Sequence, residues 1–126
     1  MFGIESIEPN AAPERLRALH DYALFPELFD AIADGVVIYY EPALREFTLP
    51  NVDGVSAYVL NYCPLTGARL PPSLRDEWYD ALEAAGAFPV DEAPPVDFLA
   101  PPAYRSDAWW RDTELARFDD DETPLP

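Results

Sequence analysis

The sequence predicts an α+β fold in which helices flank a small antiparallel β-meander. Residues 13–35 and 73–86 have the apolar spacing of helices, and each stretch closes on a glycine, a residue that ends helices well. Between them lie three short runs rich in β-branched and aromatic residues, which are typical of strands. A chain of 126 residues has the size of one domain, and its 15 prolines predict short elements with many turns.

The N-terminal part is predicted to hold an arm followed by helices. Residues 1–12 are short, polar and interrupted by proline, so we expect an arm with at most a brief strand around residues 2–7. The helical pattern starts at Pro13, Pro26 breaks or restarts it, and Gly35 ends it. We place a single domain at residues 13–118 and a solvated acidic tail at residues 119–126.

The middle of the chain is predicted to form the meander. Strands are expected at residues 36–40, 45–49 and 55–62, with a turn at residues 51–54 between the second and the third. These runs are close together in the sequence, so consecutive strands pair as hairpins. The expected sheet is therefore antiparallel.

The clearest helix is predicted at residues 73–85. Ser73 is placed to cap it, and Asp76 three residues later completes a short capping box. One face carries the apolar side chains Leu74, Trp78 and Leu82. We expect this helix to be the structural centre of the domain.

The part after this helix is predicted to be extended and then briefly helical. Residues 87–104 are too rich in proline for a helix and are expected to wrap the domain as an extended segment. Ser106 is placed to cap a short terminal helix that includes Trp109 and Trp110.

The charge restricts the classes of partner. The chain carries 24 acidic residues against 8 basic ones, a formal net charge of -16. Such a surface repels nucleic acid, because affinity for a polyanion comes mainly from cations. It attracts a partner with a basic surface and speeds their encounter, although acidity can also serve solubility alone. One cysteine excludes an internal disulfide, and the sequence offers no leader and no apolar run of membrane-spanning length, so we expect a cytoplasmic protein without membrane contact.

A block at residues 61–86, NYCPLTGARLPPSLRDEWYDALEAAG, resembles an uncharacterised bacterial family, a domain of unknown function. Members of that family share CPxCGxxLPxSLRDxWxxxLxxLG and a C-terminal SDxWW segment, which SDAWWR matches in this chain. The resemblance covers about residues 28–111. It implies a compact α+β domain built around a turn that resembles a zinc knuckle.

The resemblance implies that this knuckle is degenerate here. Cys63 matches the first thiol of the family, but Thr66 stands where the second is expected, and a neutral hydroxyl is a poor zinc ligand. The family's further upstream cysteines are also missing. We therefore expect no metal and no other cofactor, with Pro64 and Gly67 keeping the tight turn and Cys63 packing as a structural residue.

Two sets of residues are compatible with either a functional or a structural role. Cys63 could act as a nucleophile with His20 as its base, but a lone cysteine more often packs as a small apolar residue. Trp109 and Trp110 could anchor a partner or close over the core. The residues that we place at a partner surface are Asp91, Glu92, Trp109, Trp110, Asp119, Asp120, Asp121 and Glu122.

These observations predict a binding protein rather than an enzyme, because no complete catalytic or metal-binding set can be found. The first hypothesis is an inhibitor or immunity protein whose acidic surface neutralises a basic toxin or nucleic-acid-handling enzyme. The alternatives are a housekeeping adaptor domain descended from a zinc-ribbon-like ancestor, and an enzyme that depends on Cys63. The oligomeric state stays open at this stage.

Overall fold

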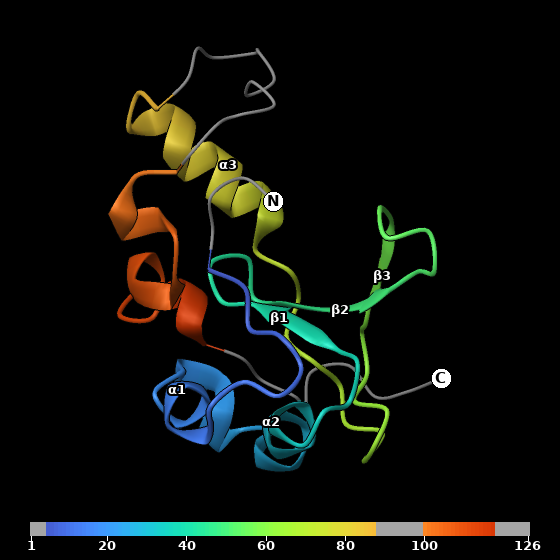
Figure 1. The fold of residues 1–126 in the computed structure, drawn as a ribbon. Helices are drawn as coiled ribbons and strands as arrows, with labels where there is room; N and C mark the ends of the chain where they lie inside the picture. The colour runs from blue at the N-terminus through green and yellow to red at the C-terminus, as the bar shows by residue number, and fades with distance from the viewer. Residues whose placement is uncertain (1–4, 88–99, 118–126) are drawn as a thin grey trace.

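The computed structural model describes residues 5–87 and 100–117 and confirms the α+β class (Figure 1). Within these residues, three α-helices and four 3-10 turns accompany a sheet of three antiparallel strands in the order β1-β2-β3. The helices are α1 (Pro13–Arg17), α2 (Pro26–Ala33) and α3 (Arg75–Ala84), and the strands are β1 (Tyr39–Glu41), β2 (Glu46–Pro50) and β3 (Ala57–Val59). None of the described helices is long and apolar enough to cross a membrane.

The N-terminal helices form as the prolines predict. Pro13 and Pro26 each stand in the first turn of a helix, where the missing N–H costs nothing. Gly35 follows α2 with φ of 105°, a left-handed conformation that favours glycine. Residues 5–12, expected as an arm, contribute Ile7 to the core: it is 1% exposed and its backbone pairs with Tyr40.

The meander is present: β2 has the predicted length with a shift of one residue, while β1 and β3 are shorter than the sequence predicts. Val36 and Val37 are exposed, and β1 begins only at Tyr39. The β1–β2 hairpin is the buried part of the sheet, because Tyr40 and Phe47 pair across it and both are 1% exposed. All three residues of β3 are exposed.

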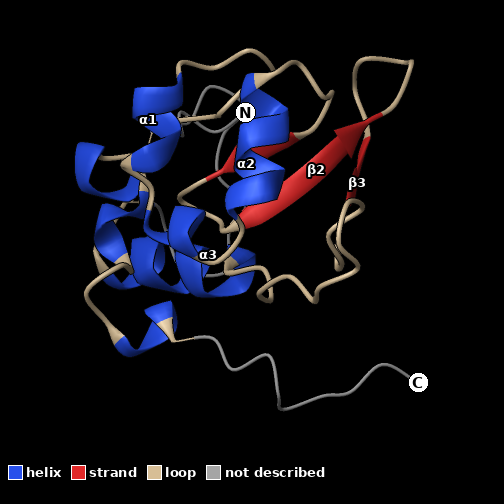
Figure 2. Cartoon of the chain, turned by 90° about the horizontal axis from the view of Figure 1, so that it is seen from below, coloured by secondary structure: helices blue, strands red, loops and turns tan. Residues whose placement is uncertain are grey.

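The described core has two parts. The larger lies between α1, α2 and the sheet, and it comprises Ile7, Leu16, Phe25, Leu28, Phe29, Ile32, Ile38, Tyr40, Phe47, Cys63 and Leu70. The smaller lies under α3 and comprises Ala43, Leu44, Trp78, Leu82 and Ala100. Figure 2 shows α3 and the 3-10 turns on one side of the molecule, away from the β2–β3 hairpin.

Helix α3 starts two residues later than expected. Ser73 does not occupy the cap position, which belongs to Leu74. Its hydroxyl nevertheless accepts a hydrogen bond from the backbone N–H of Arg75 at 3.1 Å, so it still satisfies one N–H of the first turn. Trp78 and Leu82 are both 0% exposed and face the core as predicted.

Candidate interaction surfaces

The two adjacent tryptophans close over the turn between β1 and β2. The indole N–H of Trp110 donates to the carbonyl of Pro42 at 2.7 Å, and that of Trp109 donates to Ala43 at 2.8 Å. Trp110 is 0% exposed, which favours the alternative that it closes over the core, because a paired and fully buried indole presents no surface. Trp109 is half-buried and remains a candidate contact. Ser106 caps the 3-10 turn η3 (Asp107–Trp109) as predicted.

Arg45 is buried beneath these tryptophans. Its guanidinium donates to the carbonyl of Pro72 through Nε at 3.1 Å and Nη2 at 2.9 Å, and to Leu115 through Nη1 at 2.6 Å. It also lies over the Trp110 ring at 5.4 Å. Burial lowers the pKa of Arg45, and the carboxylate of Asp21 opposes that shift. This arginine joins three distant segments and is not available to a partner.

Asp21 and Asp107 are the other buried charges of this region. The hydroxyl of Tyr40 donates to Asp21 at 2.9 Å, and the backbone N–H of His20 donates to Asp107 at 3.0 Å. Burial raises the pKa of Asp21, while the Tyr40 hydrogen bond lowers it. The His20 ring packs edge-on against Trp110 at 5.4 Å. These groups are held by internal hydrogen bonds and act as structural links.

Two buried glutamates stand opposite each other on β1 and β2. Glu46 receives two hydrogen bonds from the Arg75 guanidinium, at 2.9 and 2.8 Å, and one from the Ser73 hydroxyl. Glu41 accepts only long hydrogen bonds, from Ser6 at 3.4 Å and Thr48 at 3.5 Å. Burial, and then the charge of Glu46, raise the pKa of Glu41 to about 7. Glu46 ties the hairpin to the start of α3.

The surface charge follows from these internal contacts. Of the eight arginines, the exposed ones are Arg15, Arg17 and Arg117. The exposed acidic side chains among the described residues are Glu5, Glu8, Glu14, Glu27, Asp30, Asp34, Asp53, Asp76, Asp80, Asp112 and Glu114. The described structure therefore buries one arginine, leaves four partly exposed and three exposed, and presents a strongly acidic surface.

Residues 63–67 form a tight turn. The N–H of Gly67 donates to the carbonyl of Cys63 at 2.8 Å, and Gly67 has φ of 77°. Thr66 accepts a hydrogen bond from the N–H of Ala68 at 3.2 Å, so its hydroxyl supports the turn. Cys63 is 3% exposed, which gives a substrate no access to its thiol. Within residues 5–87 and 100–117, no group of three or more His, Cys, Asp or Glu side chains is placed to hold a metal ion.

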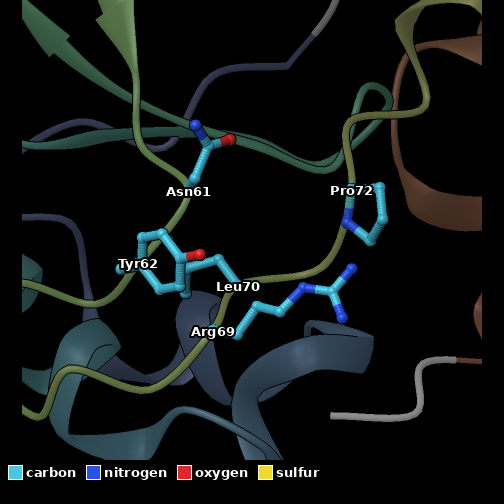
Figure 3. Close-up of a pocket in the computed structure, with 5 residues that line it drawn as sticks. All are labelled: Asn61, Tyr62, Arg69, Leu70 and Pro72. Carbon is cyan, nitrogen blue, oxygen red and sulfur yellow. The ribbon is translucent and has the colours of Figure 1, made fainter. Parts of the chain in front are cut away.

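A second surface lies on the β2–β3 hairpin, which both ribbon views show projecting away from the helices (Figures 1 and 2). Its exposed apolar side chains are Leu49, Val52, Val55, Tyr58 and Val59. We call these five residues the hairpin surface. A pocket of about 320 Å³ lies next to its C-terminal end, lined by Asn61, Tyr62, Arg69, Leu70 and Pro72 (Figure 3).

Sequence reasoning missed both the buried charges and the hairpin surface. Arg45 meets Pro72 and Leu115, which are 27 and 70 residues away, and no local pattern signals such partners. The hairpin surface does leave a trace in the sequence: the segment between Phe47 and Ala68 contains a single charged residue, Asp53. The acidic candidates Asp91, Glu92, Asp119, Asp120, Asp121 and Glu122 lie outside the described residues.

The chain belongs to a family of unknown function: the model of the Domain of unknown function DUF6980 matches residues 18–112. This confirms membership of an uncharacterised family. No curated protein and no solved structure matches the chain.

Proposed function

We propose that this chain is a non-catalytic protein-binding module that uses its acidic surface to hold a partner with a basic surface. The particular form that we favour is an immunity or inhibitor protein acting in the cytoplasm on a basic toxin or nucleic-acid-handling enzyme. The observation that carries the proposal is the imbalance of surface charge, with three exposed arginines beside eleven exposed acidic side chains among the described residues.

The acidic surface supports binding in two ways. Its summed field speeds the encounter with a basic partner, an effect that falls steeply with ionic strength. On α3, Asp76 and Asp80 are exposed one turn apart, while Trp78 on the opposite face is fully buried. The half-buried Trp109 packs against the same core cluster and offers a short-range aromatic contact.

The test begins with capture of partners from an extract of the source organism at low salt, followed by elution with salt. We expect a basic protein whose association rate falls as ionic strength rises from ~0.01 M to ~1 M, because the screening length shortens from ~30 Å to ~3 Å. A partner that is acidic or uncharged, or whose association ignores salt, contradicts the proposal.

A matched pair of variants locates the contact. Asp76→Asn with Asp80→Asn removes two charges from α3, and Glu27→Gln with Asp34→Asn removes the same charge at the two ends of α2. Both pairs should slow association about equally, since steering depends on total charge. Only the α3 pair should speed dissociation, because short-range contacts set the off-rate. Equal off-rates in both variants would exclude α3 as the contact.

A further inference from the structure

The edge of the sheet at β3 is open. The N–H of Leu60 donates to Phe47 and the N–H of Asn51 donates to Ser56, which sets the ladder between β2 and β3. Along such a ladder, the backbone N–H and C=O groups of successive residues point alternately toward the partner strand and away from it. Those of Tyr58 point toward its partner Leu49 on β2. The backbone groups of Ala57 and Val59 therefore point outward, and no hydrogen bond to them is found from the rest of the described chain.

This edge lacks most of the protection that sheets usually carry. β3 holds no charged residue, no proline and no bulge, which are common devices against edge pairing. Its side chains Tyr58 and Val59 are 64% and 45% exposed. Beyond β3, the carbonyl of Asn61 accepts the N–H of Leu70, so the open stretch ends there.

The charge distribution points to a second copy of this chain as the occupant. Two chains of net charge -16 repel each other over most of their surfaces. The segment from Phe47 to Ala68 is the exception, because Asp53 is its single charged residue. Seven of the ten large apolar side chains that are exposed in the described structure lie between Leu49 and Leu65. Interface cores are depleted in charge in this manner.

We propose that two chains associate through antiparallel pairing of their β3 strands, which joins the two sheets into one of six strands. Pairing about a two-fold axis at Tyr58 brings Ala57 of one copy opposite Val59 of the other. The outward backbone groups of both residues then form four hydrogen bonds, so the edge is complementary to itself. The hairpin surfaces of the two copies meet at the same place.

The same register brings the second copy up to the pocket. Val55 of that copy arrives at the end of the open stretch, where the carbonyl of Asn61 is already paired with Leu70, and so lies beside the pocket lined by Asn61, Leu70 and Pro72. Val55 is 92% exposed in the single chain. Its burial beside the pocket adds apolar contact to the short backbone ladder.

Salt separates this dimer from binding to a basic partner. We measure the mass in solution by sedimentation equilibrium over a range of chain concentrations, at ionic strengths of ~0.01 M and ~1 M. We expect a dimer that strengthens with salt, because screening removes the repulsion between two acidic chains. A chain that stays monomeric at both ionic strengths overturns the dimer and leaves the proposed function untouched.

Charge variants locate the interface. Tyr58 meets itself across the axis as a non-hydrogen-bonded pair, the closest kind of cross-strand neighbour. Tyr58→Glu should therefore raise the dimer dissociation constant at least ~10-fold, whereas Tyr58→Gln should raise it less than ~3-fold. Val37→Glu adds the same charge at another exposed site and should change it less than ~2-fold. Equal effects of Tyr58→Glu and Val37→Glu overturn the proposal.

Amide hydrogen exchange tests the backbone pairing directly in the unmodified chain. The amides of Ala57 and Val59 should exchange at least ~10-fold more slowly at concentrations where the dimer forms than in dilute solution. The amide of Leu60, already bonded to Phe47, should change little and is the internal control. A dimer in which Ala57 and Val59 exchange as fast as in the monomer does not use this edge, and the proposal then fails.

Discussion

A few buried polar residues hold distant parts of this chain together. Arg45 illustrates this role. It is 4% exposed and donates hydrogen bonds to the carbonyls of Pro72 and Leu115, which lie 27 and 70 residues further along the chain. Its backbone has φ of 49°, an uncommon conformation for a residue other than glycine. The planar guanidinium suits this position, because it serves two carbonyls at once and stacks on Trp110.

Arg45→Lys should therefore be strongly destabilising despite keeping the charge. A lysine has no fork of donors, so the Pro72 or Leu115 carbonyl loses its partner, and we expect a loss of about 2–4 kcal/mol in the free energy of unfolding. Urea denaturation measures it. Arg17→Lys on the exposed surface is the control and should change stability by less than about 0.5 kcal/mol. Similar midpoints for the two variants would show that Arg45 has no structural role.

Glu41 should make stability depend on pH. Its pKa is raised from 4.5 to about 7 in the fold, so the folded chain binds a proton that the unfolded chain releases. Its contribution is present below pH 4.5 and is lost as pH rises through about 7. Glu41→Gln should thus stabilise the protein more at pH 8 than at pH 5, by up to ~3 kcal/mol. Denaturation at both pH values measures this, and a difference no larger than that of the exposed control Glu8→Gln would contradict it.

Among the elements, α3 joins the second core to the hairpin. Trp78 is 0% exposed, and its indole N–H donates to the carbonyl of Tyr104 at 2.8 Å. At the start of α3, Ser73 and Arg75 hold Glu46. The helix therefore contacts both the sheet and the C-terminal turns.

Trp78→Ala should be the most damaging substitution in α3. Removing a buried indole costs roughly 3–5 kcal/mol, a large share of the stability of a domain of this size. Thermal unfolding followed by circular dichroism measures it. The neighbouring Asp80→Ala changes an exposed position of the same helix and should leave the melting temperature nearly unchanged. A folded Trp78→Ala protein with an unaltered melting temperature would mean that the indole does not hold the core.

Local patterns in the sequence predicted the helices and strands better than they predicted the contacts between distant residues. The spacing of Leu74, Trp78 and Leu82 identified α3 and its buried face, because a helix is defined by neighbours along the chain. The start of α3 was misplaced by two residues, since helix caps tolerate such shifts. The buried Glu41, Arg45 and Glu46 could not be predicted, because charged residues are expected at the surface unless distant partners are known.

At the scale of the whole molecule, exposed carboxylates far outnumber exposed arginines and produce an unbalanced surface charge. Three arginines are exposed beside eleven acidic side chains in the described structure. Repulsion among these acids opposes the compact state. The same imbalance supports the proposed binding to a basic partner.

Dilute protein should therefore become more stable as salt is added. Raising sodium chloride from ~0.01 M to ~1 M screens the acidic surface, and a gain of ~1 kcal/mol corresponds to a rise of roughly 2–8 °C in the melting temperature. Differential scanning calorimetry measures it at concentrations too low for association. A melting temperature that falls with salt would show that the internal pairs Arg75–Glu46 and Arg111–Asp107 outweigh the surface repulsion.

The tryptophan hydrogen bonds also constrain how the chain can fold while it is being made. The carbonyls of Pro42 and Ala43 receive their donors from Trp110 and Trp109, which are 68 and 66 residues further along. During synthesis the β1–β2 hairpin therefore leaves the ribosome with these carbonyls open to water, and it stays incomplete until residue 110 has emerged. Because closing such long loops is slow compared with forming local contacts, we expect these two hydrogen bonds to form after the helices and the hairpin itself.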